Sequence, residues 1–334
     1  MKRAFAVLAV LMALTAACLA ALRWISRPPG GSREVVFGVE PGWSARRITS
    51  ALEDSGLVRS SLYALWRAHS LGLSDGFQAG RYLLDSSMSP DSILRIIARG
   101  DVIPVPTHWV TLPEGLTLEE ALTTLSSSLD MPRAELSEAV SDRALLDSLG
   151  LPGAEGYLFP ETYEIADSLT AREVLERLVS TFESRWEPSW DTALADLGLS
   201  RHEAVILASI VEREARLDEE RPVVAGVFLR RLRLGMRLES CATVQYALGG
   251  VRERLSFADT RIESPWNTYL HEGLPPGPIC SPGTSSLAAV AYPDTSQGYL
   301  FFVSRGDGSG AHLFASTLSG HQANIRLARS GVTH

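Results

Sequence analysis

The sequence predicts an α+β protein in three parts: a single N-terminal transmembrane helix, a small α+β module over residues 34–103 and a larger α+β domain over residues 104–334. Short strand-like runs alternate with helix-period stripes in both later parts, and 334 residues suffice for two domains. Hydrophobic content of 45% and charged content of 21% are typical of globular proteins. The net charge of −8 argues against a nucleic-acid partner, which would require surplus Lys and Arg.

The N-terminal segment predicts the compartment. Lys2 and Arg3 precede an uncharged run from Ala4 to Leu22. As a helix this run is roughly 28 Å long, about the thickness of a bilayer's hydrocarbon core. We expect residues 1–3 to be cytoplasmic and residues 4–25 to cross the cytoplasmic membrane, because basic residues favour the cytoplasmic side. The folded parts are then expected outside the cytoplasm.

Two other fates of this segment are open. A cleaved signal peptide usually has a shorter apolar region, of about 7–15 residues. A lipoprotein cleavage site before Cys18 would carry a large aliphatic residue where Thr15 stands. Each alternative still predicts export.

The module at 34–103 follows a Pro- and Gly-rich linker at 26–33. Hydroxyl side chains that cap helices and glycines that end them divide it into short elements. In order these are a strand at Val35–Val39, a helix from Ser44 to Gly56, a helix after Ser60, a strand at Tyr82–Leu84 and a helix from Ser89 to Gly100. The strand–helix–helix–strand order resembles a LysM-like sugar-binding module.

The larger domain contains both regular elements and irregular loops. Thr117 and Glu120 form a capping box before a helix, and Ala171–Arg185 is expected as an amphipathic helix. Prolines and glycines from Gly273 to Gly283 exclude helix and central strand. The chain is expected to close with a hairpin of Tyr299–Val303 and Ala311–Phe314, followed by a helix at 322–329.

An aromatic stretch from Glu155 to Tyr163 is expected to be a shaped loop and not a regular element. Tyr157, Phe159 and Tyr163, with the carboxylate of Glu161, have the composition of a groove that stacks on sugar rings. A loop that caps the hydrophobic core is the alternative, and the sequence does not separate the two.

Glu214 is the acid that the pattern selects. Leu207, Ile210 and Val211 recur at the spacing of one helix face, and Glu214 takes the next position on that face. Desolvation penalises the charged form of a carboxyl group there. A carboxyl group that keeps its proton is the general acid that cleavage of a glycosidic bond requires.

Two ordinary roles compete with this interpretation. Glu214 could lie at the edge of its helix with its carboxylate extended into solvent, or it could pair with an arginine such as Arg230 or Arg231. Its neighbour Glu212 is expected on the solvent side, four residues before Arg216, as a surface or supporting charge.

Other chemistry is not indicated. The sequence has no phosphate-binding glycine loop, no Ser–His–Asp order and no zinc spacing. We therefore expect no metal and no cofactor. Outside the N-terminal segment the cysteines are Cys241 and Cys280, and a disulfide between them is one possibility in an oxidising compartment.

Several motifs in fixed order closely resemble those of the endolytic murein transglycosylases, the MltG or YceG-like family. The resemblance covers nearly the whole chain. The motifs are Glu155–Tyr163, Ala208–Glu214, Arg221–Phe228, Leu234–Leu238, Asn267–Tyr269, Gly273–Gly277 and the C-terminal hairpin with His312, Phe314 and His321.

The resemblance implies that residues 104–334 are a catalytic domain: a lyase that cuts within nascent peptidoglycan strands, leaves 1,6-anhydro-MurNAc ends and so limits strand elongation. It implies that Glu214 is catalytic and that one carboxyl group serves as acid and then as base. It also implies peptidoglycan strands as the substrate, the cytoplasmic membrane as the location and penicillin-binding glycan synthases as candidate partners. The expected substrate-binding residues are Tyr157, Phe159, Glu161, Tyr163, Thr243, Asn267, Thr268 and Tyr269.

The chain departs from the family pattern at three places. Arg230 stands where the family usually has Asn, and Cys241-Ala242 stand where it has Asp-Pro. Cys280 stands in the Pro-rich loop, where a small or polar residue is more usual. Two alternative functions stay open: a muramidase-type hydrolase, and a non-catalytic, membrane-tethered scaffold that binds glycan.

Overall fold

The computed structural model describes residues 2–250, 252 and 255–330. Met1, the first residue of the expected cytoplasmic segment 1–3, lies outside the described residues. The chain divides into two compact units, residues 1–105 and 106–334. Both combine helices with two-stranded antiparallel sheets, so the α+β prediction is confirmed.

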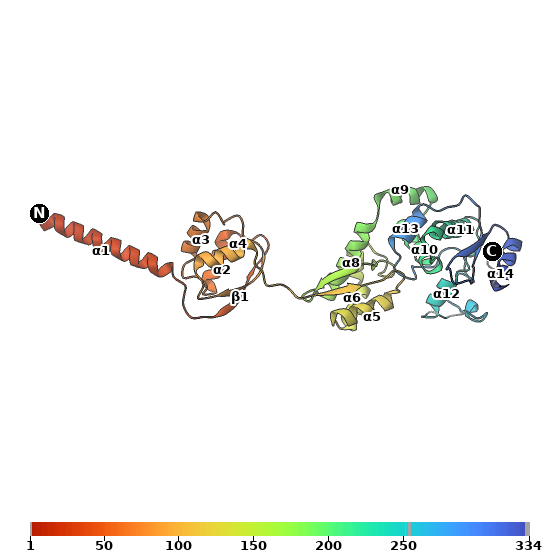
Figure 1. Ribbon diagram of the computed structural model, residues 1–334, viewed down its shortest axis with the longest axis horizontal. Coiled ribbons are helices and arrows are strands. Elements are labelled where there is room, and N and C mark those ends of the chain that lie inside the picture. The colour runs from red at the N-terminus through yellow and green to blue at the C-terminus, as the bar shows by residue number, and fades with distance from the viewer. Residues whose placement is uncertain (1, 251, 253–254, 331–334) are drawn as a thin grey trace. The chain divides into compact units, whose positions relative to one another are not determined.

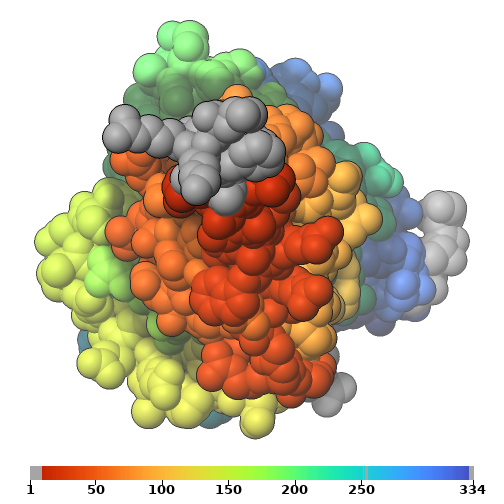
Figure 2. Space-filling view, turned by 90° about the vertical axis from the view of Figure 1, so that its left-hand side faces the viewer, coloured from red at the N-terminus to blue at the C-terminus, as the bar shows by residue number. Residues whose placement is uncertain are grey.

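The first unit begins with helix α1 (Lys2–Ile25) (Figure 1). None of the helices described in the structure combines the length and the apolarity needed to cross a bilayer. The predicted transmembrane anchor at 4–25 therefore gains no support. Seven large apolar side chains of α1 are exposed: Val10, Leu11, Met12, Leu14, Leu19, Leu22 and Trp24. The surface coloured red in Figure 2 belongs to this N-terminal part of the chain.

The module after α1 has the predicted order of elements. Strand β1 pairs antiparallel with β2, with Phe37 opposite Tyr82. Ser44, Ser60 and Ser89 accept hydrogen bonds from the first turns of the three helices. The elements are β1 (Glu34–Val39), α2 (Ala45–Asp54), α3 (Ser61–Ser70), β2 (Gly80–Asp85) and α4 (Pro90–Arg99).

The second unit contains the larger core. Its strands are β3 (Thr107–Thr111), β4 (Thr162–Ala166), β5 (Phe301–Ser304) and β6 (His312–Ala315). Its first helices are α5 (Leu118–Leu129), α6 (Arg133–Ser141), α7 (Arg143–Ser148), α8 (Ala171–Arg185) and α9 (Pro188–Leu197). Its later helices are α10 (Arg201–Glu214), α11 (Arg221–Arg233), α12 (Cys241–Ala247), α13 (Thr284–Ala291) and α14 (Leu318–Ser330), with short 3-10 turns at Asp218–Glu220 and Asp259–Arg261.

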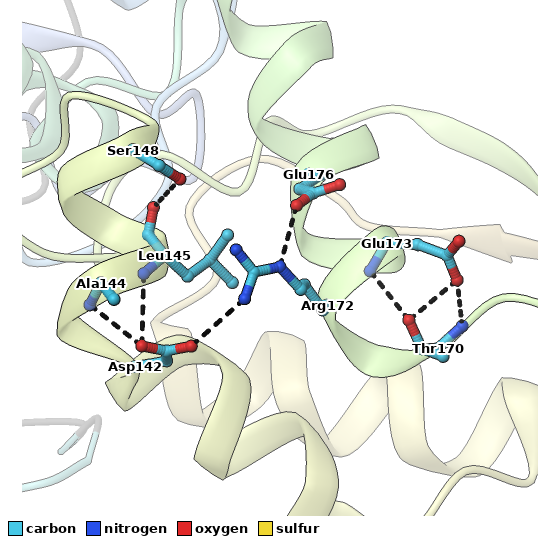
Figure 3. A network of polar contacts seen from close by, with 8 residues as sticks. All are labelled: Asp142, Ala144, Leu145, Ser148, Thr170, Arg172, Glu173 and Glu176. Carbon is cyan, nitrogen blue, oxygen red and sulfur yellow. Dashed lines mark hydrogen bonds and ion pairs between the residues drawn. The ribbon is translucent and has the colours of Figure 1, made fainter.

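Polar contacts connect α7 and α8 at one end of this unit. The carboxylate of Asp142 accepts from the backbone N–H groups of Ala144 and Leu145, at 2.9 and 3.2 Å, and so caps α7. Its other oxygen lies 3.5 Å from Nη1 of Arg172, the second residue of α8, which also pairs with Glu176 (Figure 3). Asp142 therefore caps α7 and also contacts the first turn of α8.

Strands β3 and β4 pair antiparallel, with Val110 opposite Tyr163. The prediction that residues 155–163 are entirely loop is wrong at its end, because Thr162 and Tyr163 belong to β4. Pairing with β3 makes these two residues part of a strand, although the Gly and Pro residues just before them favour a loop.

Helix α10 lies at the centre of the second unit and packs against α11 and α13 (Figure 1). Every residue from Ala204 to Val211 is buried. The chain comes so close to α11 that a Cβ atom on Gly226 would lie 2.1 Å from the carbonyl oxygen of Asp294, so only glycine fits there. This buried helix carries Glu214 at its last position.

Candidate active site

Glu214 ends α10, where Ala215 leaves the helical conformation. Its Oε1 accepts a hydrogen bond from Ser240 Oγ at 2.5 Å and a longer one from the backbone N–H of Ala242 at 3.4 Å. The predicted alternative of a pairing with Arg230 or Arg231 is wrong for the structure described here. The half-buried carboxyl group is therefore held by neutral donors through Oε1, and Oε2 has no hydrogen-bond partner among the described residues.

Buried side chains bind the backbone of Ser240, the residue whose hydroxyl group contacts Glu214. Thr268 Oγ1 accepts from the backbone N–H of Ser240 at 3.0 Å and lies 2.9 Å from Thr243 Oγ1. Thr243 also donates to the carbonyl oxygen of Ser240. Asn267 donates from Nδ2 to the carbonyl oxygens of Thr260 and Ile262, at 3.1 and 2.9 Å.

Three of the expected substrate-binding residues, Thr243, Asn267 and Thr268, are thus at most 2% exposed and satisfied by internal hydrogen bonds. Their geometry supports the segment that holds Glu214, and does not present their side chains to a ligand. Tyr269 is placed differently, because it lines the cavity at Glu214.

That cavity has a volume of about 440 Å³. Tyr269 Oη lies 3.2 Å from Cys241 Sγ in its wall, and burial raises the pKa values of both groups. Both are therefore neutral hydrogen-bonding groups at physiological pH. The residues that line the cavity are Glu214, Arg231, Leu238, Glu239, Cys241, Tyr269, Phe302, Val303, Ser304, His312 and His321.

Arg231 fixes the backbone beside this cavity. Its guanidinium group donates to the carbonyl oxygens of Leu300, Arg237 and Leu238, at 2.7, 3.0 and 3.0 Å. It also pairs with Glu239, which has a left-handed φ of 51°. Such a backbone conformation is uncommon for a residue other than glycine and concentrates at functional sites.

His312, which also lines the cavity, is paired with Glu220. His312, at the start of β6, has Nδ1 2.6 Å from Glu220 Oε2. The backbone N–H of His312 donates to Glu220 Oε1 at 2.9 Å. Residue patterning gives no catalytic role to His312, because its partner is 92 positions away in the sequence. The family resemblance includes His312 in the C-terminal hairpin.

Glu212 differs from its prediction. Its side chain is only 5% exposed and pairs with Arg221, with Nη2–Oε1 and Nη1–Oε2 distances of 3.1 and 3.2 Å. The backbone N–H of Gly283 donates to it at 3.0 Å. The prediction of a solvent-side charge near Arg216 is wrong, because α11 and α13 cover the side of α10 that would face water on an isolated amphipathic helix.

The aromatic stretch packs into the core. Tyr157, Phe159 and Tyr163 are each 4–5% exposed. The rings of Tyr157 and Phe159 pack edge-on against Phe182, with distances between ring centroids of 5.0 and 6.4 Å. Tyr163 Oη donates to the carbonyl oxygen of Phe159 at 2.6 Å. These three rings therefore behave as the alternative prediction has it, as part of a loop that caps the hydrophobic core.

Glu161 lies on the outside of the same stretch. Its carboxylate pairs with Arg185 at 2.5 Å, and both side chains are more than a third exposed. None of these four residues lines the cavity at Glu214.

Glu155, at the start of the stretch, occupies a second cavity of about 500 Å³. It accepts from the backbone N–H of Leu118 at 2.9 Å and from Tyr246 Oη at 3.0 Å. Burial raises the pKa of Glu155 to about 7. Residue patterning missed this carboxyl group, because its burial depends on α5 and α12.

Within the described parts of the chain, no group of three or more His, Cys, Asp and Glu side chains is arranged to hold a metal ion. The cavity at Glu214 is lined by side chains with carboxyl, imidazole, hydroxyl, thiol and guanidinium groups.

The sequence profile of the YceG-like family matches residues 37–327. The chain belongs to the YceG-like family. It is 30% identical over 321 residues to an endolytic murein transglycosylase of Streptococcus pneumoniae, a match that covers 87% of this chain and 58% of that protein. It is 28% identical over 303 residues to an endolytic murein transglycosylase of Bacillus subtilis, with 86% and 82% covered.

A crystal structure of a YceG-like protein from Listeria monocytogenes is similar to this chain, with a TM-score of 0.59 and 27% sequence identity. The match covers 88% of this chain and 99% of that one. By contrast, this YceG-like chain spans 58% of the length of the S. pneumoniae relative.

The three departures from the family pattern lie in different surroundings. Cys241 lines the cavity and Ala242 donates its backbone N–H to Glu214, whereas Arg230 is exposed. The cysteines of this YceG-like chain are all free thiols, and the considered disulfide between Cys241 and Cys280 is absent. Cys280 is fully buried and its Sγ lies 3.3 Å from the carbonyl oxygen of Ser209, so it is a packed core residue.

Proposed function

We propose that this protein is an endolytic lytic transglycosylase that cleaves the MurNAc–GlcNAc bond within nascent peptidoglycan strands and leaves 1,6-anhydro-MurNAc ends. Such cuts would limit strand elongation. The observation that carries the proposal is Glu214 itself, fixed through one oxygen by Ser240 and Ala242 in a cavity that Tyr269 also lines. The names of the S. pneumoniae and B. subtilis relatives support the same activity.

The proposed reaction has two proton transfers. Protonated Glu214 gives its proton to the glycosidic oxygen as the bond to the anomeric carbon breaks. The C6 hydroxyl of the same sugar loses a proton and bonds to the anomeric carbon, which closes the 1,6-anhydro ring. An internal nucleophile is already at high effective concentration, so a second carboxylate to activate water is not required. In the simplest form, Glu214 performs both transfers in turn.

The decisive experiment is digestion of purified glycan strands by wild type and by Glu214→Gln. Wild type is expected to release fragments with anhydro ends, and the variant none, with the fold retained by circular dichroism. A muramidase-type hydrolase would instead give reducing ends, which are heavier by one water per cut in mass spectrometry. Unchanged cutting by Glu214→Gln would refute the assignment of Glu214.

The strand–helix–helix–strand module at 34–103 supports a further part of the proposal, a LysM-like role in holding glycan. A scaffold without catalysis predicts that strand binding survives Glu214→Gln and that wild type leaves strand length unchanged. Co-sedimentation with insoluble peptidoglycan, measured beside the digest, separates binding from cutting.

The proposed location follows from the proposed substrate. Because peptidoglycan lies outside the cytoplasm, the second unit is proposed to face the extracytoplasmic side of the cytoplasmic membrane. Protease added to spheroplasts is then expected to degrade it. Penicillin-binding glycan synthases stay a prediction from the family resemblance, and cross-linking in cells would test it.

A further inference from the structure

His312 has the geometry of an oriented catalytic histidine. Both oxygens of Glu220 are used to hold it, one by the ring Nδ1 at 2.6 Å and one by the backbone N–H at 2.9 Å. The two side chains are 8% and 14% exposed, so water competes little for this pairing. A carboxylate on Nδ1 fixes the proton there, and the neutral ring then has its lone pair on Nε2.

Nε2 faces available space. Within the described residues, no hydrogen-bond partner occupies Nε2, while the ring lines the cavity that holds Glu214. Phe302, which also lines that cavity, packs edge-on against the ring at 5.3 Å and restricts its rotation. A fixed base with an unused lone pair thus shares one cavity with the proposed acid.

We propose that His312 is a second catalytic group, which takes the proton of the sugar's C6 hydroxyl while Glu214 protonates the leaving oxygen. This inference rests on the proposed function and divides between two residues the transfers that one carboxyl group would otherwise perform. The C6 oxygen forms its bond to the anomeric carbon as the bond to the leaving oxygen breaks. The reaction leaves His312 protonated and Glu214 ionised, and a proton passing from one to the other through solvent restores both.

The cavity's geometry favours this division. Glu214 receives hydrogen bonds from Ser240 and Ala242 on one oxygen, which leaves one oxygen for proton donation to the substrate. A carboxyl group and an imidazole group that line the same cavity can serve two different atoms of one sugar. The groups that can alter the charge state of His312 are Glu220, Glu214, Arg231, Glu239, Cys241, Tyr269 and His321.

His321 is not an equivalent candidate. Burial and the nearby Arg231 lower the pKa of His321, and its ring stacks on Phe301 at 5.2 Å. Its Nδ1 is buried and has no hydrogen-bond partner in the described part of the chain. Among the described residues, no carboxylate is hydrogen-bonded to His321 in the way that Glu220 is to His312.

The test measures the rate of cutting and the type of end between pH 5 and 8, on defined glycan strands, with the full chain. His312→Gln is expected to slow cutting by roughly 10²- to 10⁴-fold, the usual contribution of general acid–base catalysis. The pH profile of cutting is expected to differ between wild type and His312→Gln, because an imidazole that takes part in proton transfer is replaced by an amide. With no base at the C6 hydroxyl, water competes, so the fraction of reducing ends is expected to rise.

Two further variants keep the result interpretable. Glu220→Gln retains the histidine but weakens its orientation, and is expected to slow cutting by less than His312→Gln. His108→Gln is the control, because His108 also pairs with a carboxylate, Asp167 at 3.1 Å, but on the exposed surface of β3. That control is expected to behave as wild type.

An unchanged pH profile and an unchanged fraction of anhydro ends in folded His312→Gln would overturn the inference and leave the proposed function intact. Absence of anhydro ends from wild type would overturn the proposed function itself. If His312→Gln loses its fold, Glu220→Gln decides, since a pH profile and product ratio equal to wild type would contradict a role for the pair in proton transfer.

Discussion

Ser240 Oγ lies 2.5 Å from Glu214 Oε1, and this contact joins the end of α10 to the start of α12. The proposed acid is therefore positioned by a segment 26 residues further along the chain. Cys241 and Ala242, two of the departures from the family pattern, lie in that segment, and Ala242 supplies its backbone N–H to the carboxyl group. The proline of the family pattern has no backbone N–H, so this second contact depends on the departure at position 242.

Ser240→Ala tests this positioning. The variant removes the shorter hydrogen bond to Glu214, and hydrogen bonds to charged groups contribute about 1.5–3 kcal/mol. We expect cutting to slow by roughly 10- to 100-fold, the rate equivalent of that free energy. Rates on defined strands, with melting temperatures of both proteins, check it. Wild-type cutting by Ser240→Ala would show that Ser240 does not position the acid.

Glu212 and Arg221 form a buried ion pair that is expected to stabilise the fold. Glu212→Ala would leave Arg221, 8% exposed, without this partner. Breaking a buried pair from one side costs about 3–5 kcal/mol. Denaturant unfolding of the variant measures the loss. Glu161→Ala, which breaks the exposed pair with Arg185, is the matched control and is expected to cost about 0–1 kcal/mol.

Glu155 is expected to make stability depend on pH. Burial raises its pKa from 4.5 to about 7, so the folded protein holds this proton more tightly than the unfolded chain. Its contribution is therefore fully present below about pH 4.5 and is lost as pH rises through 7. The shift corresponds to a few kcal/mol, since one pKa unit is about 1.4 kcal/mol.

The measurement is the unfolding free energy of wild type and Glu155→Gln from pH 4 to 8. The amide can keep both contacts, by accepting from Leu118 and donating to Tyr246 Oη. We expect the advantage of wild type over the variant to shrink as pH rises, and the variant to be the more stable at pH 8. Parallel curves would contradict the burial of an ionisable group at this position.

Phe159→Ala separates the two interpretations of the aromatic stretch. Phe159 is 4% exposed, and replacing a buried Phe by Ala costs about 3–5 kcal/mol. We expect that loss in denaturant unfolding, with the KM for glycan strands unchanged at a temperature where the variant is folded. A raised KM without loss of stability would instead favour the sugar-stacking groove.

Local signals were sufficient for much of the fold. The helix predicted at Ala171–Arg185 has those bounds, because Thr170 and Glu173 form a capping box and the apolar stripe has one period. The hairpin of β5 and β6 and the three capped helices of the first unit formed for the same reason. Hydrogen bonds and periodicity within a few residues are properties of the sequence itself.

The register that places Glu214 beside Ile210 and Val211 is likewise a property of the sequence, because one helical turn relates these positions. The tertiary structure alone decided that Ser240 holds Glu214, that Glu212 is buried, that Tyr157, Phe159 and Tyr163 pack into the core, and that Glu220 meets His312 across 92 residues. Each of these depends on which surfaces cover a helix or a loop after the chain has folded. Packing determines which residues are buried and which distant segments pair, and the local periodicity of the sequence does not predict either.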